Sequence, residues 1–520
     1  MYDLAIVGSG FGGALTGLIA RRFGLNVILL ERGTHPRFAI GESSTPLTNI
    51  LIETLADEYD LPRLKPLSKY GAWKRTYPEV GVGLKRGFSF YHHPLGRPFA
   101  DSDDRSDQLL AAASPHEEIA DTHWYRPDFD WFLVREAQLA GVDYVDRVAL
   151  SNFERKGGRC QLSGERGGVP YSINCRFTID ASGPNGFLSR VLSLPQRTFK
   201  DFPATQGLFT HFRDVRLFAD VHPPRCPDGL PYPIDASALH HVFDGGWIWV
   251  LRFDNGITSA GVAATDETAA RFGFSEGEPA WRRLLDDLPS VRDQFDGAKV
   301  VEEWRYSPQL PFRSNVVHGP GFALLPSAAA FIDPIFSTGF ALTLLGIQRI
   351  ASAIRDTWGT PEFESRMTTH ASATLAEADM AAELVGTCYG LFDTFPLFTG
   401  LATFYLAAVS YAETCSRMGD PERASGFLAY KDPTFVSGLR KCNSEAKRLK
   451  SLGEQADTCA FFEMVARYIE PRNIAGLADA SRRNWYPVEI DALVQNAHKL
   501  GRSREEMEEY IHAKGLAKYR

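Results

Sequence analysis

A glycine-rich turn within the first 31 residues constrains the fold more than any other feature. Gly8, Gly10 and Gly13 are spaced as G-x-G-x-x-G, with an apolar segment before them, a run of small residues after them, and a second apolar segment that ends at Glu31. A strand, a turn, a helix and a second strand in this order form a unit that holds a dinucleotide. The three glycines permit the tight turn, the approach of a pyrophosphate and the close packing of helix on strand, and the helix N-terminus attracts phosphate. Glu31 stands where a carboxylate accepts hydrogen bonds from a ribose, so we expect an α/β dinucleotide-binding unit here.

The composition is that of an ordinary globular protein, with 44% hydrophobic and 23% charged residues in a chain of 520. The net charge of −8 gives no basic footprint for nucleic acid or for an anionic membrane, so neither is expected as a partner. An apolar stretch over residues 389–409 is interrupted by Asp393 and Pro396, which argues against a membrane span.

The seven cysteines are scattered and form no C-x-x-C pair. This spacing predicts neither a structural metal site nor a disulfide framework, and it favours a reducing, cytoplasmic location. The first strand begins at residue 2, which leaves no room for a signal peptide.

Periodicity divides the rest of the chain. We expect helices over residues 45–59 and 126–140, and a strand over 85–93 in which small or polar residues alternate with aromatic ones. Strand patterns dominate from about 209 to 306, whereas the chain after about 360 has helical patterns. Shorter strands are expected over residues 144–148, 160–163, 171–173, 177–180, 240–243, 247–253, 258–263 and 322–325, and further helices over 279–288 and 338–355.

Three further segments combine small residues with hydroxyl groups. They are Gly41-Glu42-Ser43-Ser44-Thr45-Pro46, Ile179-Asp180-Ala181-Ser182-Gly183 and Phe331-Ile332-Asp333-Pro334-Ile335-Phe336-Ser337-Thr338-Gly339. A glycine turn followed by hydroxyl groups at a helix start suits the edge of a flavin or a phosphate, although a plain Ser/Thr helix cap gives the same pattern. The third segment leads into a helix whose N-terminus suits an anion, with a loop punctuated by proline and glycine as the alternative.

Together these segments resemble the flavin-dependent halogenases, in particular the phenol and pyrrole halogenases, a branch of the FAD proteins of the glutathione-reductase type. The resemblance covers about residues 2–355 and implies an α/β fold with a Rossmann-like FAD-binding domain, an inserted β-sheet substrate domain and a helical C-terminal region. The implied division of the chain is 1–200 for the FAD-binding domain, interleaved with substrate-domain strands, 201–320 for the inserted sheet, 321–358 for the return to the FAD-binding domain, and 359–520 for the helical region.

The resemblance implies that FAD, in the form FADH2, is held by residues from all of these segments, and it implies no metal. Arg126 is included because Arg126-Pro127-Asp128-Phe129-Asp130 resembles an R-x-x-F-D helix start of the family; its acidic residues also simply favour a helix N-terminus. The implied FAD-binding residues are Gly8, Gly10, Phe11, Gly12, Gly13, Glu31, Arg32, Glu42, Ser43, Ser44, Arg126, Ser182, Gly183, Ser327, Pro334 and Gly339.

A halide, chloride or bromide, is implied by the same resemblance at the backbone N–H groups of Thr338 and Gly339. Two residues nearby depart from the family pattern. Ser327 stands where many relatives have the aspartate of a Gly-Asp-Ala turn, and Phe336 stands where tryptophan halogenases have a glutamate just before S-T-G. The missing acid favours a ring that is already electron-rich, such as a phenol.

Trp247 and Trp249 match the two tryptophans of the family's W-x-W-x-I-P motif, which is thought to keep the substrate away from the flavin, although Arg252 replaces the proline. Two tryptophans at this spacing on a strand also form one face of an ordinary core.

Lys85 is the residue on which the implied chemistry depends. The family's lysine stands at the head of a short aromatic strand, where it binds hypohalous acid or forms a chloramine close to the arene. Lys85, in Gly83-Leu84-Lys85-Arg86-Gly87-Phe88, fits this context, whereas Lys69 and Lys74 lie nearer to the G-E-S segment but lack the strand. A solvated surface charge is the plain alternative for any lysine.

The resemblance therefore implies an oxidoreductase of secondary metabolism that uses FADH2, O2 and halide to halogenate an electron-rich, phenolic aromatic compound, free or bound to a carrier protein. Since the sequence has no second G-x-G-x-x-G to hold a nicotinamide cofactor, we expect a separate flavin reductase to supply FADH2. A FAD-dependent aromatic hydroxylase or monooxygenase is the main alternative, followed by a flavin reductase of lipid-like substrates and a catalytically silent flavin-binding protein. Candidates for lining the substrate cavity, with core packing as the alternative for each, are Phe90, Tyr389, Phe392 and Phe395.

Overall fold

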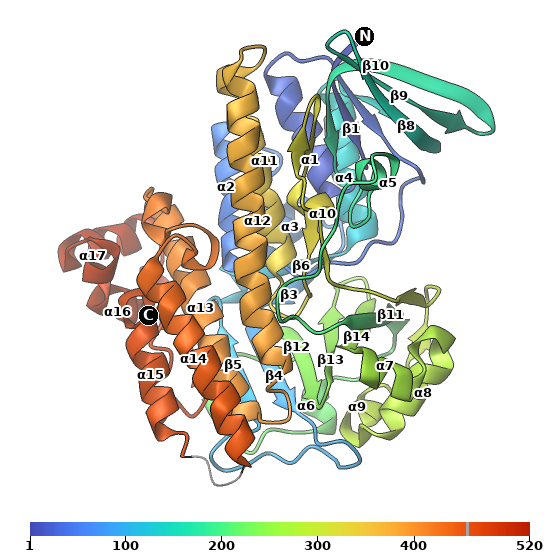
Figure 1. The fold of residues 1–520 in the computed structure, drawn as a ribbon. Coiled ribbons are helices and arrows are strands. Elements are labelled where there is room, and N and C mark those ends of the chain that lie inside the picture. The colour runs from blue at the N-terminus through green and yellow to red at the C-terminus, as the bar shows by residue number, and fades with distance from the viewer. Residues whose placement is uncertain (454–456) are drawn as a thin grey trace.

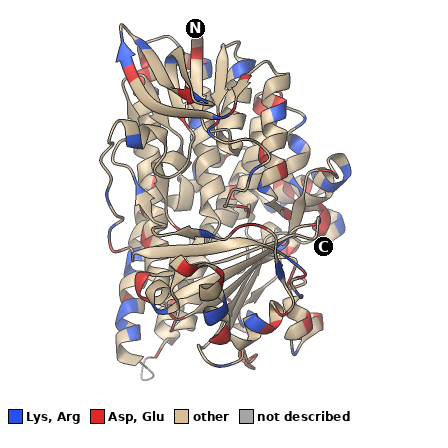
Figure 2. Cartoon of the chain, turned by 90° about the vertical axis from the view of Figure 1, so that its right-hand side faces the viewer, with Lys and Arg blue, Asp and Glu red and all other residues tan. Residues whose placement is uncertain are grey.

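The computed structural model describes residues 1–453 and 457–520. Figure 1 shows two large β-sheets, one above the other, with long helices running beside both of them and the C-terminal helices packed outside. The mixed α/β architecture expected from the sequence is confirmed. Figure 2 shows Lys and Arg interspersed with Asp and Glu over both layers, in keeping with the modest net charge.

The upper sheet contains the glycine turn. Strand β1 lies between β2 and β10, all three are parallel, and β10 also pairs with β19 in parallel. Strands covered on both faces need nearly continuous apolar sequence, which β1 and β2 supply. The main strands are β1 Tyr2–Val7, β2 Val27–Leu30, β7 Asp143–Val145, β10 Val169–Asp180, β18 His318–Gly319 and β19 Phe322–Leu324. The helices packed on this layer are α1 Phe11–Arg22, α4 Arg126–Leu139, α5 Phe187–Val191 and α10 Pro326–Ala329.

Strand β10 is longer than its sequence pattern suggests. The expected strands over 171–173 and 177–180 are one continuous strand, because its first half pairs with β9 and its second half with β1. Strands β8 (Val148–Lys156) and β9 (Arg159–Arg166) complete an antiparallel meander that projects from the sheet (Figure 1).

The lower sheet gathers strands from three distant parts of the chain. Strand β4 pairs in parallel with β12, which sets Phe90 beside His240. Strand β21 pairs with β5, so the region after residue 360, expected to be helical, also supplies a strand to this sheet. The strands are β4 Gly87–His92, β5 Gln108–Ala112, β11 Thr205–Arg213, β12 Ala238–Phe243, β13 Gly246–Arg252, β14 Thr258–Thr265, β15 Lys299–Val300, β16 Arg305–Ser307 and β21 Trp485–Tyr486.

The aromatic strand expected over 85–93 is two strands in two different sheets. Strand β3 (Val82–Lys85) pairs with β6 (Asp121–Trp124) in a small sheet of its own, whereas β4 begins at Gly87 and joins the lower sheet. The chain changes sheets at Arg86, whose N–H bonds the carbonyl of Ala236. A Cβ atom at Gly87 would lie 2.3 Å from the carbonyl oxygen of Ala111, so the crossing requires glycine there.

Three long helices run beside the sheets: α11 (Thr338–Thr357), α12 (Glu362–Tyr389) and α13 (Phe395–Arg417). Helix α13 has the length and apolarity of a membrane span, but 83% of its most apolar window is buried inside the protein. The remaining helices are α2 Pro46–Glu58, α3 Tyr70–Thr76, α6 Phe218–Val221, α7 Asp266–Phe272, α8 Glu278–Asp286, α9 Pro289–Gln294, α14 Pro433–Leu452, α15 Cys459–Ile469, α16 Ile490–Gln495 and α17 Arg504–Ala513, and the two-residue strands β17 (Phe312–Arg313) and β20 (Ala330–Phe331) pair with each other.

Candidate active site

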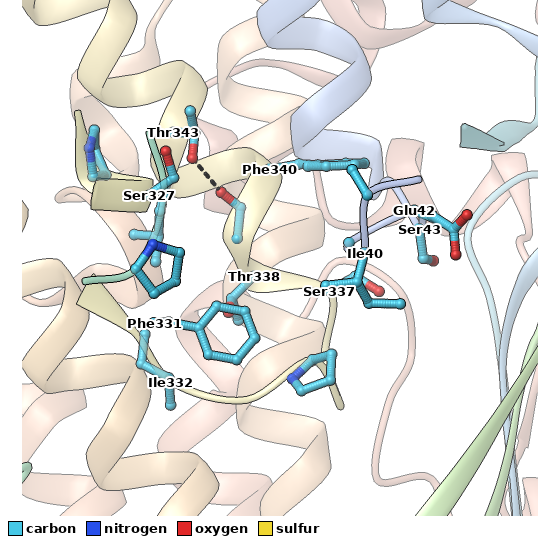
Figure 3. Close-up of a pocket in the computed structure, with 18 of the residues that line it drawn as sticks. Ile40, Glu42, Ser43, Ser327, Phe331, Ile332, Ser337, Thr338, Phe340 and Thr343 are labelled. Atoms are coloured by element: carbon cyan, nitrogen blue, oxygen red, sulfur yellow. Dashed lines mark hydrogen bonds between the residues drawn. The ribbon is translucent and has the colours of Figure 1, made fainter. Parts of the chain in front are cut away.

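A cavity of about 310 Å³ lies between the two sheets, at the ends where parallel strands β1, β10 and β19 stop. Ligands of parallel α/β sheets bind at this edge. Figure 3 shows Ile40, Glu42 and Ser43 on one side of the cavity, Ser327, Phe331 and Ile332 on the other, and Thr338 between them at the start of α11. The sequence-predicted residues in its lining are Gly10, Phe11, Gly12, Glu42, Ser43, Arg126, Gly183, Trp247, Trp249, Ser327, Pro334, Thr338 and Gly339.

Two of the turn glycines are required by packing. Gly8 has φ +100°, and a Cβ atom there would lie 2.6 Å from the carbonyl oxygen of Ala181. A Cβ atom at Gly13 would lie 1.9 Å from the carbonyl oxygen of Gly8. These contacts leave no space for a side chain, so strand β1, the turn and helix α1 pack as the sequence pattern predicts.

Gly10 has a different reason to be glycine. The three atoms nearest to a Cβ atom there would be side-chain atoms, each at 3.6 Å: Nη2 of Arg37, Nη2 of Arg126 and Oδ2 of Asp130. Gly10 is also the N-cap of α1 and provides no side-chain cap to its free N–H groups. The Nε atom of Arg37 is buried without a partner among the described residues. Two guanidinium groups, one of them with an orphaned donor, and an uncapped helix start fit the pyrophosphate of FAD.

Glu31 lies at the end of β2, outside the cavity lining. Its Oε2 accepts hydrogen bonds from the N–H and the hydroxyl of Ser9 at 3.0 and 2.7 Å, and its Oε1 accepts from the N–H of Gly33 at 2.8 Å. Burial raises the pKa of Glu31, but nearby Arg37 and these hydrogen bonds outweigh it and lower the pKa to about 2. The carboxylate is therefore charged at neutral pH, as ribose recognition requires, whereas the neighbouring Arg32 is exposed.

Arg126 fixes the loop that follows β2. Its Nε and Nη2 donate to both carboxylate oxygens of Asp130 at 2.7 and 2.8 Å, and its Nη1 donates to the carbonyls of Ile40 and Gly41 at 3.0 and 2.8 Å. The R-x-x-F-D helix start therefore ties helix α4 to the beginning of the G-E-S segment.

In the G-E-S segment some side chains pack against neighbouring elements and some line the cavity. Glu42 Oε1 pairs with Nε2 of His211 at 2.9 Å, and both side chains are fully buried. The hydroxyl of Ser44 accepts from the N–H of Thr122 at 3.2 Å, which holds the segment against β6. The helix cap of α2 is Thr45, whose hydroxyl accepts from the N–H of Thr48, so the capping alternative applies to Thr45 alone. Ser43 lines the cavity.

Lys85 is completely buried at the end of β3, so the surface alternative is wrong. Its Nζ donates to the hydroxyl of Ser43 at 2.9 Å and to the carbonyl of Ser44 at 2.6 Å, and it lies 3.7 Å from the ring centroid of Phe88. Lys85 is not itself in the cavity lining, but it reaches the cavity wall through Ser43.

The segment that leads into α11 is bound to the C-terminal helices. Ser337 has φ +54° and gives α11 no side-chain cap, which leaves the N–H groups at the helix start uncapped beside the cavity. Asp333 accepts hydrogen bonds from the N–H of Ile335 at 3.0 Å and from the hydroxyl of Tyr389 at 2.7 Å. Burial raises the pKa of Asp333 to about 6.

Trp247 and Trp249 point from β13 into the wall between the cavity and the lower sheet. Trp247 Nε1 donates to the hydroxyl of Tyr389 at 3.2 Å, and Trp249 Nε1 donates to Ser259 at 3.2 Å. Both tryptophans line the cavity, so they are more than one face of a sealed core.

The aromatic residues expected to line a substrate cavity are packed against one another instead. Phe90 stacks on His240 at 4.4 Å and meets Phe398 edge-on at 5.4 Å. Phe336 stacks on Tyr405 at 4.7 Å. Among the described residues, the lining of the 310 Å³ cavity does not include Phe90, Tyr389, Phe392 or Phe395. These four residues therefore lie outside this cavity, and their part in a substrate site stays a prediction.

The D-A-S-G turn serves mainly as a support. The hydroxyl of Ser182 donates to Asp180 at 2.5 Å and accepts from the N–H of Phe187 at 2.8 Å, which closes the turn. Gly183 has φ +86°, and a Cβ atom there would meet no described atom within 4 Å, so this glycine borders open space at the cavity.

Sequence reasoning missed Arg37, His240 and Asp121. A cation shortly after the acid that ends β2 is a usable signal for Arg37, because phosphate sites favour arginine. No local pattern singles out His240, which lines the cavity, or Asp121, which lies opposite Lys85 on the adjacent strand.

The chain matches no protein-family model. It is similar to the monodechloroaminopyrrolnitrin halogenase PrnC of Pseudomonas fluorescens, with 28% identity over 407 residues that cover 76% of this chain and 69% of that protein. It is also similar to the tetracycline 7-halogenase of Kitasatospora aureofaciens, with 29% identity over 371 residues that cover 68% of this chain and 64% of that protein, which is less than two thirds of its length. The fold matches the crystal structure of halogenase PltM in complex with phloroglucinol and FAD, with a TM-score of 0.82, 25% identity, and coverage of 93% of this chain and 99% of that one.

Proposed function

Because this chain is a flavin-dependent halogenase, we propose that it uses FADH2, oxygen and chloride or bromide to halogenate an electron-rich, phenolic ring at Lys85. One observation carries this proposal. A fully buried lysine touches, through Ser43, the wall of a cavity whose other features suit FAD. Such a separation lets an oxidised halogen form in one place and meet the arene in another.

The FAD-binding residues act by placing charge and excluding water. Arg37, Arg126 and the N-terminus of α1 would bind the pyrophosphate beside Gly10, and the Glu31 carboxylate at the end of β2 would accept hydrogen bonds from the ribose. Ser327 and Gly183 line the same cavity and would help to hold the remaining parts of the cofactor. Reduced FAD, when bound, supplies the electrons with which oxygen and a halide give hypohalous acid.

We place the halide at the N-terminus of α11. The N–H groups of Thr338 and Gly339 are uncapped, the helix dipole is positive there, and both residues line the cavity. Asp333 holds the preceding turn through the N–H of Ile335, which keeps these donors in position.

Hypohalous acid is proposed to pass between the sheets to Lys85. Trp247 and Trp249 form part of the wall on this side and keep the aromatic substrate away from the cofactor. Lys85 then binds the oxidant through its Nζ, and its hydroxyl and carbonyl partners fix the direction of that group. The arene would lie next to Lys85, near the aromatic residues of β4 and α13.

A phenol is the substrate class that we favour. The structural neighbour PltM was solved with phloroglucinol, a free phenol, and this chain has Phe336 where an acid would be needed to activate a less electron-rich ring. Phe336 is fully buried against Tyr405, so no carboxylate takes that place.

A separate flavin reductase would supply FADH2, since the sequence has a single G-x-G-x-x-G. The reducing cytoplasm is the proposed location, and the seven cysteines, all of which are free thiols, are compatible with it.

The test is mass spectrometry of a panel of free phenols incubated with the enzyme, FAD, NADH, a flavin reductase and chloride or bromide. We expect products with the isotope pattern of chlorine or bromine, formed only when halide and reductase are both present. A product that gains one oxygen atom without halide would identify a hydroxylase instead, and a panel left unchanged would contradict the phenolic substrate.

A further inference from the structure

Asp121 lies directly opposite Lys85 in the small β3–β6 sheet. The two strands are antiparallel and these residues are Cα partners. Lys85 is 0% exposed and Asp121 is 4% exposed. Opposed residues of an antiparallel pair have Cβ atoms about 5 Å apart, so the two side chains leave the sheet on the same face, in an interior that excludes water.

The carboxyl group of Asp121 is only half satisfied. Its Oδ1 accepts a hydrogen bond from Nδ2 of Asn49 at 2.7 Å, whereas its Oδ2 is buried without a partner among the described residues. A buried carboxylate oxygen without a donor is costly, and packing alone gives no reason to keep one. A neighbouring positive charge gives that reason.

The surroundings of Lys85 favour a positive charge. Its Nζ donates to the hydroxyl of Ser43 and to the carbonyl of Ser44, and it lies over the face of Phe88. Two oxygen acceptors and an aromatic face are the partners of an ammonium group. Among the described residues, however, this Nζ forms no ion pair within 4.0 Å, so the charge of Asp121 acts on it from beyond contact distance.

The other titratable groups nearby do not supply that charge. Burial lowers the pKa of His123 and of His240 to about 3, so both are neutral at pH 7, and burial raises the pKa of Tyr405, which is neutral as well. On α13, Glu413 pairs with Arg417 and these charges offset each other.

We propose that Asp121 is the buried counter-ion that keeps the Lys85 amine protonated, so that Lys85 meets hypohalous acid as a hydrogen-bond donor. Asp121 is a positioning residue because it acts through Lys85, and the inference rests on the proposed role of that lysine. Burial lowers the pKa of Lys85, and the charge of Asp121 opposes this shift. Burial likewise raises the pKa of Asp121, and the charge of Lys85 opposes that shift. Each group therefore favours the charged form of the other.

The first test is the pH profile of halogenation by Asp121→Asn. In the wild type we expect activity to fall on the alkaline side as Lys85 loses its proton. In Asp121→Asn, which lacks the opposite charge, the midpoint of this fall should move to lower pH by about one unit or more. At a pH above both midpoints the variant should therefore be roughly tenfold less active than the wild type, and acidification should restore its activity. An Asp121→Asn profile that is merely scaled down, with its alkaline midpoint unchanged, would overturn the proposal.

Asp128→Asn is the matched control. Asp128 is a half-buried aspartate whose Oδ2 accepts from the N–H of Gly81 at 3.0 Å, and it lies at the start of α4 rather than opposite Lys85. We expect its alkaline midpoint to equal that of the wild type. If Asp121→Asn does not fold, Asn49→Ala takes its place: losing the hydrogen bond to Oδ1 makes Asp121 a weaker counter-ion, so a smaller shift in the same direction supports the proposal and no shift overturns it.

The second test does not depend on catalysis. Unfolding by urea is measured for the full chain as the wild type, Lys85→Met, Asp121→Asn and the double variant. Each single variant leaves one buried polar group without its oppositely charged partner. The double variant should therefore lose less stability than the sum of the two single losses. Simple additivity would overturn the pairing. If instead Lys85→Met still halogenates normally, the proposed role of Lys85 fails, whatever the cycle shows.

Discussion

Tyr389 donates a hydrogen bond to Asp333 at 2.7 Å and accepts one from Trp247 at 3.2 Å. A single hydroxyl group on α12 therefore joins the turn before α11 to the strand of the W-x-W motif. This relationship assigns a task to the C-terminal helices, for which the sequence offered no motif: they hold the two walls of the cavity in register.

Tyr389→Phe should loosen both walls. It leaves Asp333 Oδ2 and Trp247 Nε1 without their buried partner, which should cost about 1–3 kcal/mol of unfolding free energy and raise the KM for halide more than it lowers kcat. Urea unfolding and halide titrations measure the two effects. Tyr411→Phe is the control, since its hydroxyl bonds the carbonyl of Lys499 away from the cavity. Equal halide KM values for the Tyr389 variant and the wild type would contradict this account.

Asp333 should make stability depend on pH. Its pKa of about 6 lies above the usual value for aspartate, so the folded protein holds this proton more tightly than the unfolded chain does. The stability that this bound proton contributes is therefore lost as the pH rises from about 4 to above 6, and the free energy of unfolding falls by up to about 3 kcal/mol. Asp333→Asn does not titrate, so its stability relative to the wild type should improve over that interval. Parallel stability curves for the two proteins, measured by urea unfolding, would show that Asp333 does not titrate as described.

Gly10→Val should remove FAD without disturbing the fold. The three atoms nearest to the added Cβ would be side-chain atoms at 3.6 Å, so no close backbone contact opposes the valine, whose side chain enters the place proposed for the pyrophosphate. We expect the variant to purify with a normal unfolding transition and without FAD absorbance. The control is Gly17→Ala in the same helix, α1. Its methyl group would lie 3.4 Å from Cδ1 of Ile6, and this variant should retain the cofactor. Stoichiometric FAD in Gly10→Val would refute the assigned site.

Gly339→Ala tests the halide position. Apart from its chain neighbours and the backbone of its own helix turn, no atom of the described residues lies within 4 Å of the Cβ that this change adds, so the methyl group enters the cavity rather than the core. Because it covers N–H groups that are proposed to bind the halide, the KM for chloride and bromide should rise about tenfold, as expected for the loss of a charge-assisted hydrogen bond. Halide affinity that stays at the wild-type value would place the anion elsewhere.

The parts of the site that the sequence predicts are those encoded in short segments. The unit from Gly8 to Glu31 has a fixed order of strand, turn and helix, and the structure contains it in that order. The aromatic context of Lys85 indicates its burial correctly, but the strand break at Arg86 depends on two sheets that no local pattern reveals.

The remaining parts depend on contacts between distant segments. Arg37 reaches Gly10 from a loop after β2, and Asp121 faces Lys85 from the neighbouring strand of the β3–β6 sheet. Phenylalanines such as Phe90 and Phe392 are common both in ligand cavities and in hydrophobic cores, and only tertiary packing decides between these two roles.

The central claim is that the halogen reaches the substrate through Lys85. The direct measurement is mass spectrometry of halogenated phenol formed by Lys85→Met, which removes the amine and keeps an unbranched side chain only one atom shorter, under conditions in which the wild type gives product. We predict that the variant retains FAD and consumes oxygen but forms less than about one hundredth of the halogenated product, since a catalytic group of this kind contributes at least about a hundredfold. Halogenated product at the wild-type rate from the FAD-loaded variant would contradict the account.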